Sequence, residues 1–167
     1  PFPLLCLLAI VLMSLIPVAT SQPERARAAG STFYVAASGS VGNGTSCASP
    51  DFVGATGTAI QSALDAASSG NTVHICEGTY SISTRLEVTK SLTIEGDGAS
   101  STTLDGLGTT QIMIIQDNDL TPNSGSEITV NVNSLGFVNG YVTAISGVSG
   151  DCTDGSTCGG AIYIEHE

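Results

Sequence analysis

The stretch NTVHICEGTYSISTRLEVTKSLTIEGDGASSTTLDG, residues 71–106, decides the fold. It contains two pairs of aliphatic residues at positions i and i+2, Val73/Ile75 and Leu92/Ile94. This period is the one expected of a β-strand that buries a single face. Glycine and serine lie between the two pairs, and glycine, serine and aspartate follow the second pair; all three accept turn geometries. The stretch therefore predicts short strands joined by turns.

The same pairing recurs further along the chain. The additional pairs are Ile112/Ile114, Val130/Val132 and Ile162/Ile164. Successive pairs start 19, 20, 18 and 32 residues apart. Short strands at such near-regular spacing are typical of repeat proteins. We interpret the long last step as one repeat with an insertion, closed at its tip by Cys152 and Cys158.

Two architectures fit short strands at this spacing. An antiparallel sandwich would place tight Asn-Gly hairpins between alternating runs. Asn43-Gly44 and Asn139-Gly140 occur, but neither lies between two such runs. In a parallel β-helix, the aliphatic pairs of successive coils stack into one continuous apolar core. We therefore expect an all-β solenoid, a parallel β-helix with a single column of buried pairs.

One segment departs from the strand pattern. Its apolar stripe, with helical spacing, consists of Ile60, Ala63, Leu64 and Ala67. Thr58 and Gln61 form a capping box, and Gly70 is placed to end the helix. We predict an amphipathic helix over 58–69 that covers the first coil, which would otherwise expose apolar side chains and a free strand edge.

The first residues predict export. Leu4–Ile16 is a short apolar run followed by Pro17, and Ala26-Arg27-Ala28 has the small-x-small form of a cleavage site. The run is shorter than the roughly 20 apolar residues that span a bilayer, although a retained membrane anchor is the alternative. We expect a signal peptide over 1–28, an N-terminal cap over 29–71, and opening β-helix coils over 72–167, truncated at the C-terminus.

The charge excludes several kinds of partner. Residues 29–167 carry 14 acidic and two basic side chains, Arg85 and Lys90. Nucleic acids and anionic membranes are bound mainly through lysine and arginine, so we expect neither as a partner, and no membrane span in the mature chain. An acidic polysaccharide would also be repelled unless a cation bridged the two surfaces.

Four cysteines follow the leader: Cys47, Cys76, Cys152 and Cys158. An even number of cysteines behind an export signal favours disulfides. Three pairings are possible, and we favour Cys47–Cys76 with Cys152–Cys158 because each closes a local loop. Zinc is the alternative, but no C-x-x-C pair is present.

The stretches TFYVAASGS, GTAIQSALDAASSGNTVHICEGTYS and LTIEGDGASSTTLDG, within Thr32–Gly106, resemble the start of right-handed parallel β-helix proteins of the pectin-lyase-like superfamily. Exported bacterial members open with a strand, a helix near an A-I-x-x-A run, and then G-x-T-Y and L-T-I-x-G motifs. Residues 159–162 also match the G-G-A-I tetrapeptide of polymorphic outer membrane protein repeats. The partner motif F-x-x-N is altered, because Asn139 follows Phe137 by two positions.

Pectate lyases of this fold, the resemblance implies, bind calcium through clustered aspartates and use an arginine as the base. The calcium candidates are Asp117, Asp119, Asp151 and Asp154. They lack the spacing of a calcium loop, and solvated turn residues are the alternative. Arg85 lies near the cap rather than on central coils, and we expect it to pair with an acid such as Glu87.

The sequence gives less support to the other residues that could act as acids, bases or metal ligands. A glycosidase needs two neighbouring carboxyl groups, which stacked coils could supply from Glu95 with Asp97 or Asp105. Alternation turns His74 outward, which indicates a surface histidine. His166 lies between two glutamates and is a candidate metal ligand. The alternative is a histidine on the outward face of a strand. We assign no catalytic residue and no cofactor, with calcium as the one candidate ion.

Two classes of function remain. The first is a non-catalytic secreted or cell-surface β-helix protein, adhesin-like or passenger-type, that contacts polysaccharide or host-surface components. The second is the N-terminal part of a polysaccharide lyase or glycoside hydrolase. We favour the first, because no cluster of arginine or lysine with aspartate is present on neighbouring coils.

Overall fold

The computed structural model describes residues 28, 30–116, 127–141 and 160–165. Its elements are β1 Thr32–Ala36, β2 Phe52–Val53, α1 Gly57–Ala66, β3 Thr72–Ile75, β4 Gly78–Ser81, β5 Leu86–Val88, β6 Leu92–Gly96, β7 Thr102–Asp105, β8 Met113–Gln116, β9 Val130–Asn133, β10 Gly136–Val138 and β11 Ile162–Glu165. The predicted signal peptide therefore lies outside the described residues, except for residue 28.

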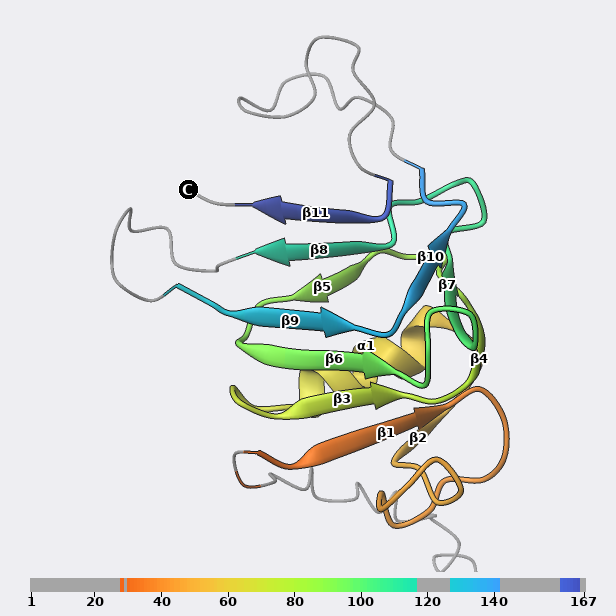
Figure 1. Cartoon of the computed structure of the whole chain (residues 1–167), viewed down its shortest axis with the longest axis vertical. Helices are drawn as coiled ribbons and strands as arrows, with labels where there is room; N and C mark the ends of the chain where they lie inside the picture. The colour runs from red at the N-terminus through yellow and green to blue at the C-terminus, as the bar shows by residue number, and fades with distance from the viewer. Residues whose placement is uncertain (1–27, 29, 117–126, 142–159, 166–167) are drawn as a thin grey trace, which may run out of the picture.

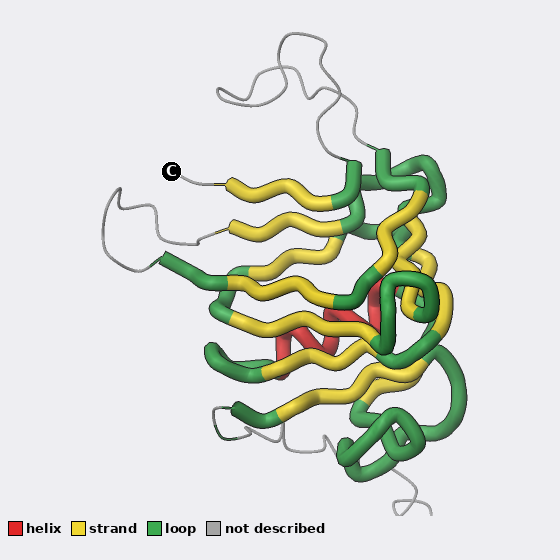
Figure 2. The backbone as a smooth tube through the Cα atoms, viewed as in Figure 1, coloured by secondary structure: helices red, strands yellow, loops and turns green. Residues whose placement is uncertain are grey.

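The strands form three sheets, and every strand pair in them is parallel. The first sheet has the order β2-β1-β3-β6-β9, the second β10-β7-β4 and the third β11-β8-β5. The chain visits the sheets in rotation, because β3, β4 and β5 are followed by β6, β7 and β8 (Figures 1 and 2). This order is the one expected of a parallel β-helix, and the antiparallel alternative is excluded for these sheets.

Each sheet stacks its own apolar side chains. In the first sheet Val73 pairs with Ile94, which pairs with Val132. In the second sheet Tyr80, Leu104 and Phe137 stack in the same way. In the third sheet the stacked residues are Leu86, Met113 and Ile162. All but the outermost member of each column are at most 1% exposed, so the three columns build one core.

The prediction of a single column of aliphatic pairs was wrong. Ile112/Ile114 and Ile162/Ile164 lie at the third sheet, away from the other three pairs. The inward-facing residues of β8 are Met113 and Ile115, which pair with Leu86 and Val88 of β5. Alternation shows which side chains turn inward, but it does not distinguish three sheets that follow the same rule.

Helix α1 is shorter than predicted, Gly57–Ala66 rather than 58–69. Ile60, Ala63 and Leu64 face the core as expected. The capping box was wrong, because the N-cap residue is Thr56 and it makes no side-chain capping hydrogen bond.

Helix α1 takes the place of a strand in the first turn of the chain. Thr56 forms a parallel bridge with Ser81 of β4, and the helix that follows packs against β5. The amide of Gln61 donates to the Glu87 carbonyl at 3.2 Å and accepts from the Glu87 N–H at 2.9 Å. The helix thus covers the free edge of the third sheet.

Glycines permit close backbone contact between successive turns. A Cβ placed on Gly140 would collide with the carbonyl oxygen of Gly160, and a Cβ on Gly160 would collide with that of Gly140. Only residues without a side chain fit at both positions. The G-G-A-I tetrapeptide therefore contains at least one glycine that backbone packing requires.

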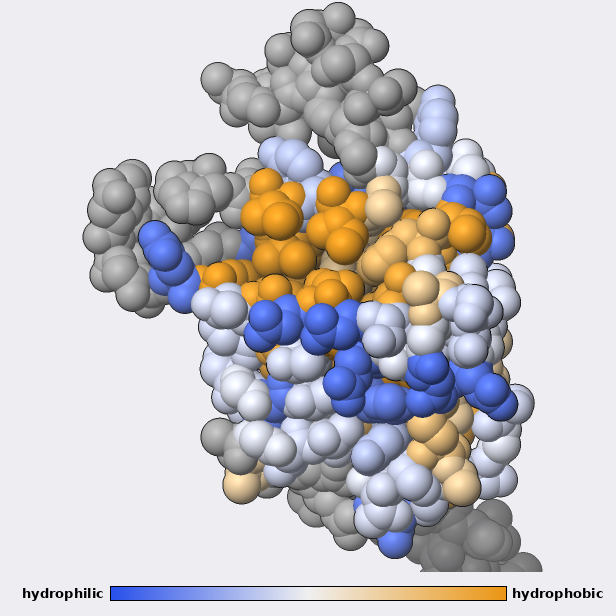
Figure 3. All heavy atoms as spheres, viewed as in Figure 1, coloured by the Kyte–Doolittle hydropathy of each residue, from blue (hydrophilic) through white to orange (hydrophobic). Residues whose placement is uncertain are grey.

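The outermost strands, β9, β10 and β11, leave apolar surface accessible. Figure 3 shows apolar residues gathered around β8, β9 and β11. Ile164 on β11 is 68% exposed, and Val138 and Tyr141 are also exposed. No helix among the described residues has the length and apolar character needed to cross a membrane.

Candidate functional site

A polar column runs along the outward face of the first sheet. The strand register aligns Tyr34 with His74, His74 with Glu95, and Glu95 with Asn133. Their neighbours Phe33, Val73 and Ile94 are buried, and Val132 is partly buried, because side chains alternate across a strand. The Tyr34 and His74 rings are 5.3 Å apart, centroid to centroid. Parallel stacking thus brings polar groups from four strands onto one surface.

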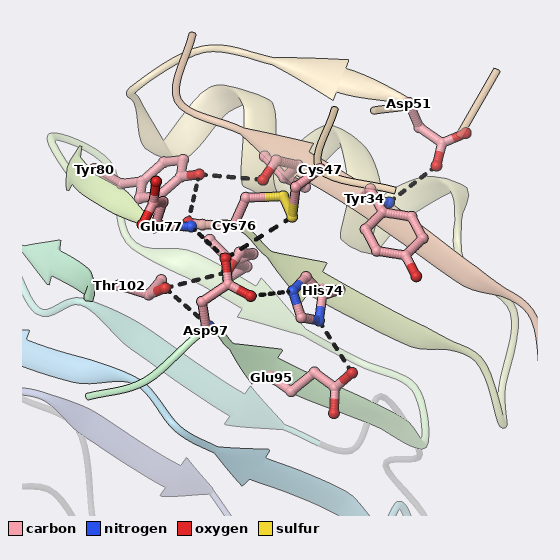
Figure 4. The surroundings of a disulfide bond; sticks show 12 residues. Tyr34, Cys47, Asp51, His74, Cys76, Glu77, Tyr80, Glu95, Asp97 and Thr102 are labelled. Carbon is pink, nitrogen blue, oxygen red and sulfur yellow. Dashed lines mark hydrogen bonds and ion pairs between the residues drawn. A yellow bond between two sulfur atoms is a disulfide. The ribbon is translucent and has the colours of Figure 1, made fainter. Parts of the chain in front are cut away.

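His74 lies between two carboxylates (Figure 4). Its Nδ1 is 3.1 Å from Glu95 Oε1, and its Nε2 is 2.9 Å from Asp97 Oδ1. The His74 side chain is 18% exposed, whereas those of Glu95 and Asp97 are 40% and 37% exposed. Ionised carboxylates only accept hydrogen bonds, so a ring nitrogen of His74 that carries a proton donates it to the carboxylate it faces.

Asp97 is held in place from several sides. Its backbone N–H donates to Thr102 Oγ1 at 3.0 Å, and its Oδ2 accepts the Glu77 N–H at 2.7 Å. Thr102 is fully buried and its hydroxyl in turn donates to the Ile75 carbonyl at 3.3 Å. The carboxylate of Asp97 is therefore held in a fixed position, although it is partly exposed to solvent.

Beside this carboxylate lies the Cys47–Cys76 disulfide, with a Cα–Cα distance of 5.7 Å. The predicted pairing of these two cysteines is confirmed. Cys47 Sγ lies 3.9 Å from Asp97 Oδ2, and this is a contact without a hydrogen bond because a disulfide sulfur carries no proton. The other predicted pair, Cys152–Cys158, lies outside the described residues.

Tyr80 lies beneath the disulfide with its side chain fully buried. Its hydroxyl oxygen lies 3.1 Å from the Val35 carbonyl oxygen and 3.0 Å from the Cys76 carbonyl oxygen. The two carbonyls share the hydroxyl proton. Burial, followed by the negative charge of Asp97, raises the pKa of Tyr80 to about 12. The phenol therefore acts as a neutral donor that anchors β1 and the disulfide to β4.

The two basic residues after the leader have structural partners. Arg85 Nη1 donates to Gln111 Oε1 at 3.2 Å, and this contact replaces the expected pairing with Glu87. Lys90 Nζ donates to the carbonyls of Leu64, Asp65 and Ala67 at 3.1, 2.8 and 2.6 Å. Lys90 thus caps the C-terminal end of α1, where a cation also interacts favourably with the helix dipole.

The structure brings together some predicted residues and separates others. Glu95 and Asp97 meet through His74, as one of the two carboxylate pairings anticipated. Asp105 lies in the second sheet, where its Oδ1 accepts from Asn139 Nδ2 at 3.0 Å. His74 faces outward as predicted, but both its ring nitrogens contact acids. The calcium candidates Asp117, Asp119, Asp151 and Asp154, and also His166, lie outside the described residues.

The proximity of Asp97 to the disulfide was missed. Asp97 is separated from Cys47 by 50 residues along the chain. The one signal in the sequence is the spacing His74-Ile75-Cys76, which puts an outward histidine two positions from a cysteine of the bridge. The parallel register of β3 and β6 then places the turn after β6 next to these three residues.

Three parallel sheets visited in rotation, with a helix in the first turn, define a pectin-lyase-like β-helix protein. Residues 45–159 match the family model described as "Rhamnogalacturonase A/epimerase, pectate lyase-like". The match spans more than half of the 167-residue chain, and the chain belongs to this family. No curated protein and no solved structure matches the chain. A similarity to polymorphic outer membrane protein repeats is not shown by the family match.

Proposed function

We propose that these residues form a non-catalytic, polysaccharide-directed part of a secreted or cell-surface β-helix protein. The observation that carries this proposal is the use of both basic residues, Arg85 and Lys90, in structural contacts. Proton abstraction by a lyase requires a base that can approach the substrate. Moving Arg85 would break its bond to the buried Gln111, and moving Lys90 would remove this donor from three carbonyls at the end of α1.

The negative charge of the chain limits the kind of polysaccharide that it can bind. Residues 29–167 carry 14 acidic and two basic side chains. A polyanionic glycan would be repelled by this surface unless divalent cations bridged the two. We therefore propose a neutral polysaccharide, or an acidic one in the presence of calcium, as the ligand.

The polar column of the first sheet is the proposed contact surface. Tyr34 and His74 offer ring faces and edges, and Asn133 offers an amide that can both donate and accept hydrogen bonds. Aromatic rings combined with a few polar groups are common in ligand sites. The stacking of strands extends this surface along the axis of the fold.

The architecture proposed for the whole protein follows from the same features. We propose a right-handed solenoid whose further coils stack on β9, β10 and β11, preceded by a cleaved signal peptide. The exposed apolar side chain of Ile164, 68% accessible on the outermost strand of its sheet, supports such stacking. An apolar surface of this kind is normally covered.

Binding of the purified full chain to insoluble polysaccharides tests this proposal. We expect retention on a neutral polymer, or on polygalacturonate only with calcium, and weaker retention of a Tyr34→Ala variant. Tyr141→Ala is the matched control, because Tyr141 is exposed and follows β10 of the second sheet, whereas the column lies on the first. No retention on any polymer, with or without calcium, would contradict the proposal.

The second candidate is the N-terminal part of a polysaccharide lyase or glycoside hydrolase. The family description, which includes rhamnogalacturonase and pectate lyase-like proteins, favours it. An ultraviolet assay for unsaturated uronate and a reducing-sugar assay, each with and without calcium, distinguish the candidates. Turnover by this chain would replace the first proposal, and Glu95→Gln and Asp97→Asn would then test the acids beside His74.

A further inference from the structure

We propose that the Cys47–Cys76 disulfide closes a latent binding site for a thiophilic divalent metal ion, for which zinc is the natural occupant. Cys47, His74, Cys76 and Asp97 each offer one ligand atom, and these atoms all lie within 4.8 Å of one another. Two sulfurs, an imidazole nitrogen and a carboxylate oxygen are ligands that zinc accepts in tetrahedral sites. The proposal is independent of the polysaccharide ligand.

The distances suit a tetrahedral ion after small side-chain movements. Zinc binds sulfur at about 2.3 Å and nitrogen or oxygen at about 2.0–2.2 Å, so its ligand atoms lie roughly 3.3–3.8 Å apart. Asp97 Oδ2 and Cys47 Sγ are already 3.9 Å apart. The two sulfurs must separate once their bond is broken, and the His74 and Asp97 side chains must part slightly from their present 2.9 Å contact.

The residues around the four ligands provide the outer contacts that zinc sites need. A zinc-bound histidine commonly donates its second ring N–H to a carboxylate, which fixes the ring orientation. Here His74 Nε2 faces Asp97, while Nδ1 lies 3.1 Å from Glu95 Oε1. Asp97 is likewise held through its Oδ2 by the Glu77 N–H. Zinc bound at Nε2 would leave the contact between Nδ1 and Glu95 intact.

The oxidation state of Cys47 and Cys76 decides whether a disulfide bond or a metal ion joins them. In the disulfide neither sulfur is a thiolate, and only thiolates ligate zinc. A dithiol reductant gives two electrons and two protons to the bridge, forming two cysteine thiols and its own cyclic disulfide. Zinc then displaces both thiol protons as it binds. The pair is therefore closed by a covalent bond in an oxidising compartment and by a metal ion in a reducing one.

The test uses the full chain with Cys6, Cys152 and Cys158 replaced by serine, so that no other thiol binds metal. The oxidised and the reduced protein are each titrated with zinc against a chromophoric chelator, and the reduced protein also with cobalt. We expect no zinc on the oxidised chain and one zinc on each reduced chain. Cobalt should give thiolate charge-transfer bands and the visible bands of a tetrahedral site.

Variants assign the ligands. His74→Gln and Asp97→Asn should weaken zinc binding at least tenfold, and Glu95→Gln should weaken it roughly 10–100-fold through the outer contact. Glu87→Gln, an exposed acid on the third sheet, is the matched control and should leave the affinity unchanged. Zinc should also protect Cys47 and Cys76 from alkylation.

Folding is followed by circular dichroism in the same samples. If the reduced chain unfolds, zinc should restore its spectrum in the parent protein and fail to do so in His74→Gln. The proposal is overturned if the reduced chain binds no zinc, if the oxidised chain binds it equally well, or if His74→Gln and Asp97→Asn retain the parent affinity.

Discussion

The side-chain amide of Gln61 bonds to the backbone of Glu87 as a neighbouring strand would. Gln61 Nε2 lies 3.2 Å from the Glu87 carbonyl oxygen, and Gln61 Oε1 accepts the Glu87 N–H at 2.9 Å. Each strand edge in a sheet presents such unpaired groups, and proteins cover them to prevent association with other chains. One glutamine on α1 thus satisfies the peptide groups of β5 that no strand reaches.

Replacing Gln61 with alanine should lower the free energy of unfolding by about 1–3 kcal/mol, because the two bonds to the Glu87 backbone, at about 0.5–1.5 kcal/mol each, are lost together with the exposed bond to Asp65 Oδ1. Urea denaturation under non-reducing conditions measures the change. Ser62→Ala is the control, since it removes only the exposed bond to the Thr58 carbonyl within the helix. Equal stability of Gln61→Ala and the parent protein would show that water replaces the amide without cost.

Lys90→Met should also destabilise the chain, by about 1–2 kcal/mol. Methionine keeps the apolar stem but leaves three carbonyls at the end of α1 without the ammonium donor. Loss of the cation near the helix C-terminus contributes about 0.3–1 kcal/mol of this effect. Lys90→Arg keeps the charge and should recover part of the stability. Thermal unfolding of the three proteins at one ionic strength gives the comparison.

The sequence predicted the features that depend on local periodicity. The inward direction of Val73 and Ile94 follows from alternation, and the buried stripe of α1 follows from helical spacing. The Cys47–Cys76 pairing followed from loop length and is confirmed. These features need information only from residues near one another along the chain.

The assignment of strands to sheets could not be predicted in this way. Ile112/Ile114 follows Leu92/Ile94 by 20 residues, which suggested one repeat, yet a full turn from β6 to β9 contains strands of all three sheets. The site around Asp97 was hidden for the same reason. Its neighbours His74 and Cys47 come from earlier turns, and only the register between turns sets their distance.

Alanine at Gly140 or Gly160 should be poorly tolerated. The added Cβ of either residue would collide with the carbonyl group of the other glycine, and neither backbone can retreat without disturbing its own turn. Overpacking of this kind typically costs about 1–3 kcal/mol. Gly57→Ala is the matched control, because its Cβ would meet no atom closer than 3.4 Å and alanine favours helix. Denaturation midpoints of the three variants decide whether backbone contact is the cause.

Stability should fall at alkaline pH because of Tyr80, whose pKa is raised from 10.0 to about 12 by burial and by the charge of Asp97. Between about pH 10 and 12 the unfolded chain loses the phenolic proton while the folded chain keeps it, so the unfolded state binds fewer protons and gains stability. The free energy of unfolding should therefore decrease with rising pH, by up to about 1.4 kcal/mol per pH unit. Below about pH 9 this effect should vanish.

Urea denaturation of the parent and of Tyr80→Phe, compared at each pH, isolates the phenol from other groups that titrate in this range. Asp97→Asn should reduce the slope, because it removes the charge that disfavours the phenolate. A pH dependence that is identical in the parent and in Tyr80→Phe would show that the phenol ionises as readily in the folded chain as in the unfolded one.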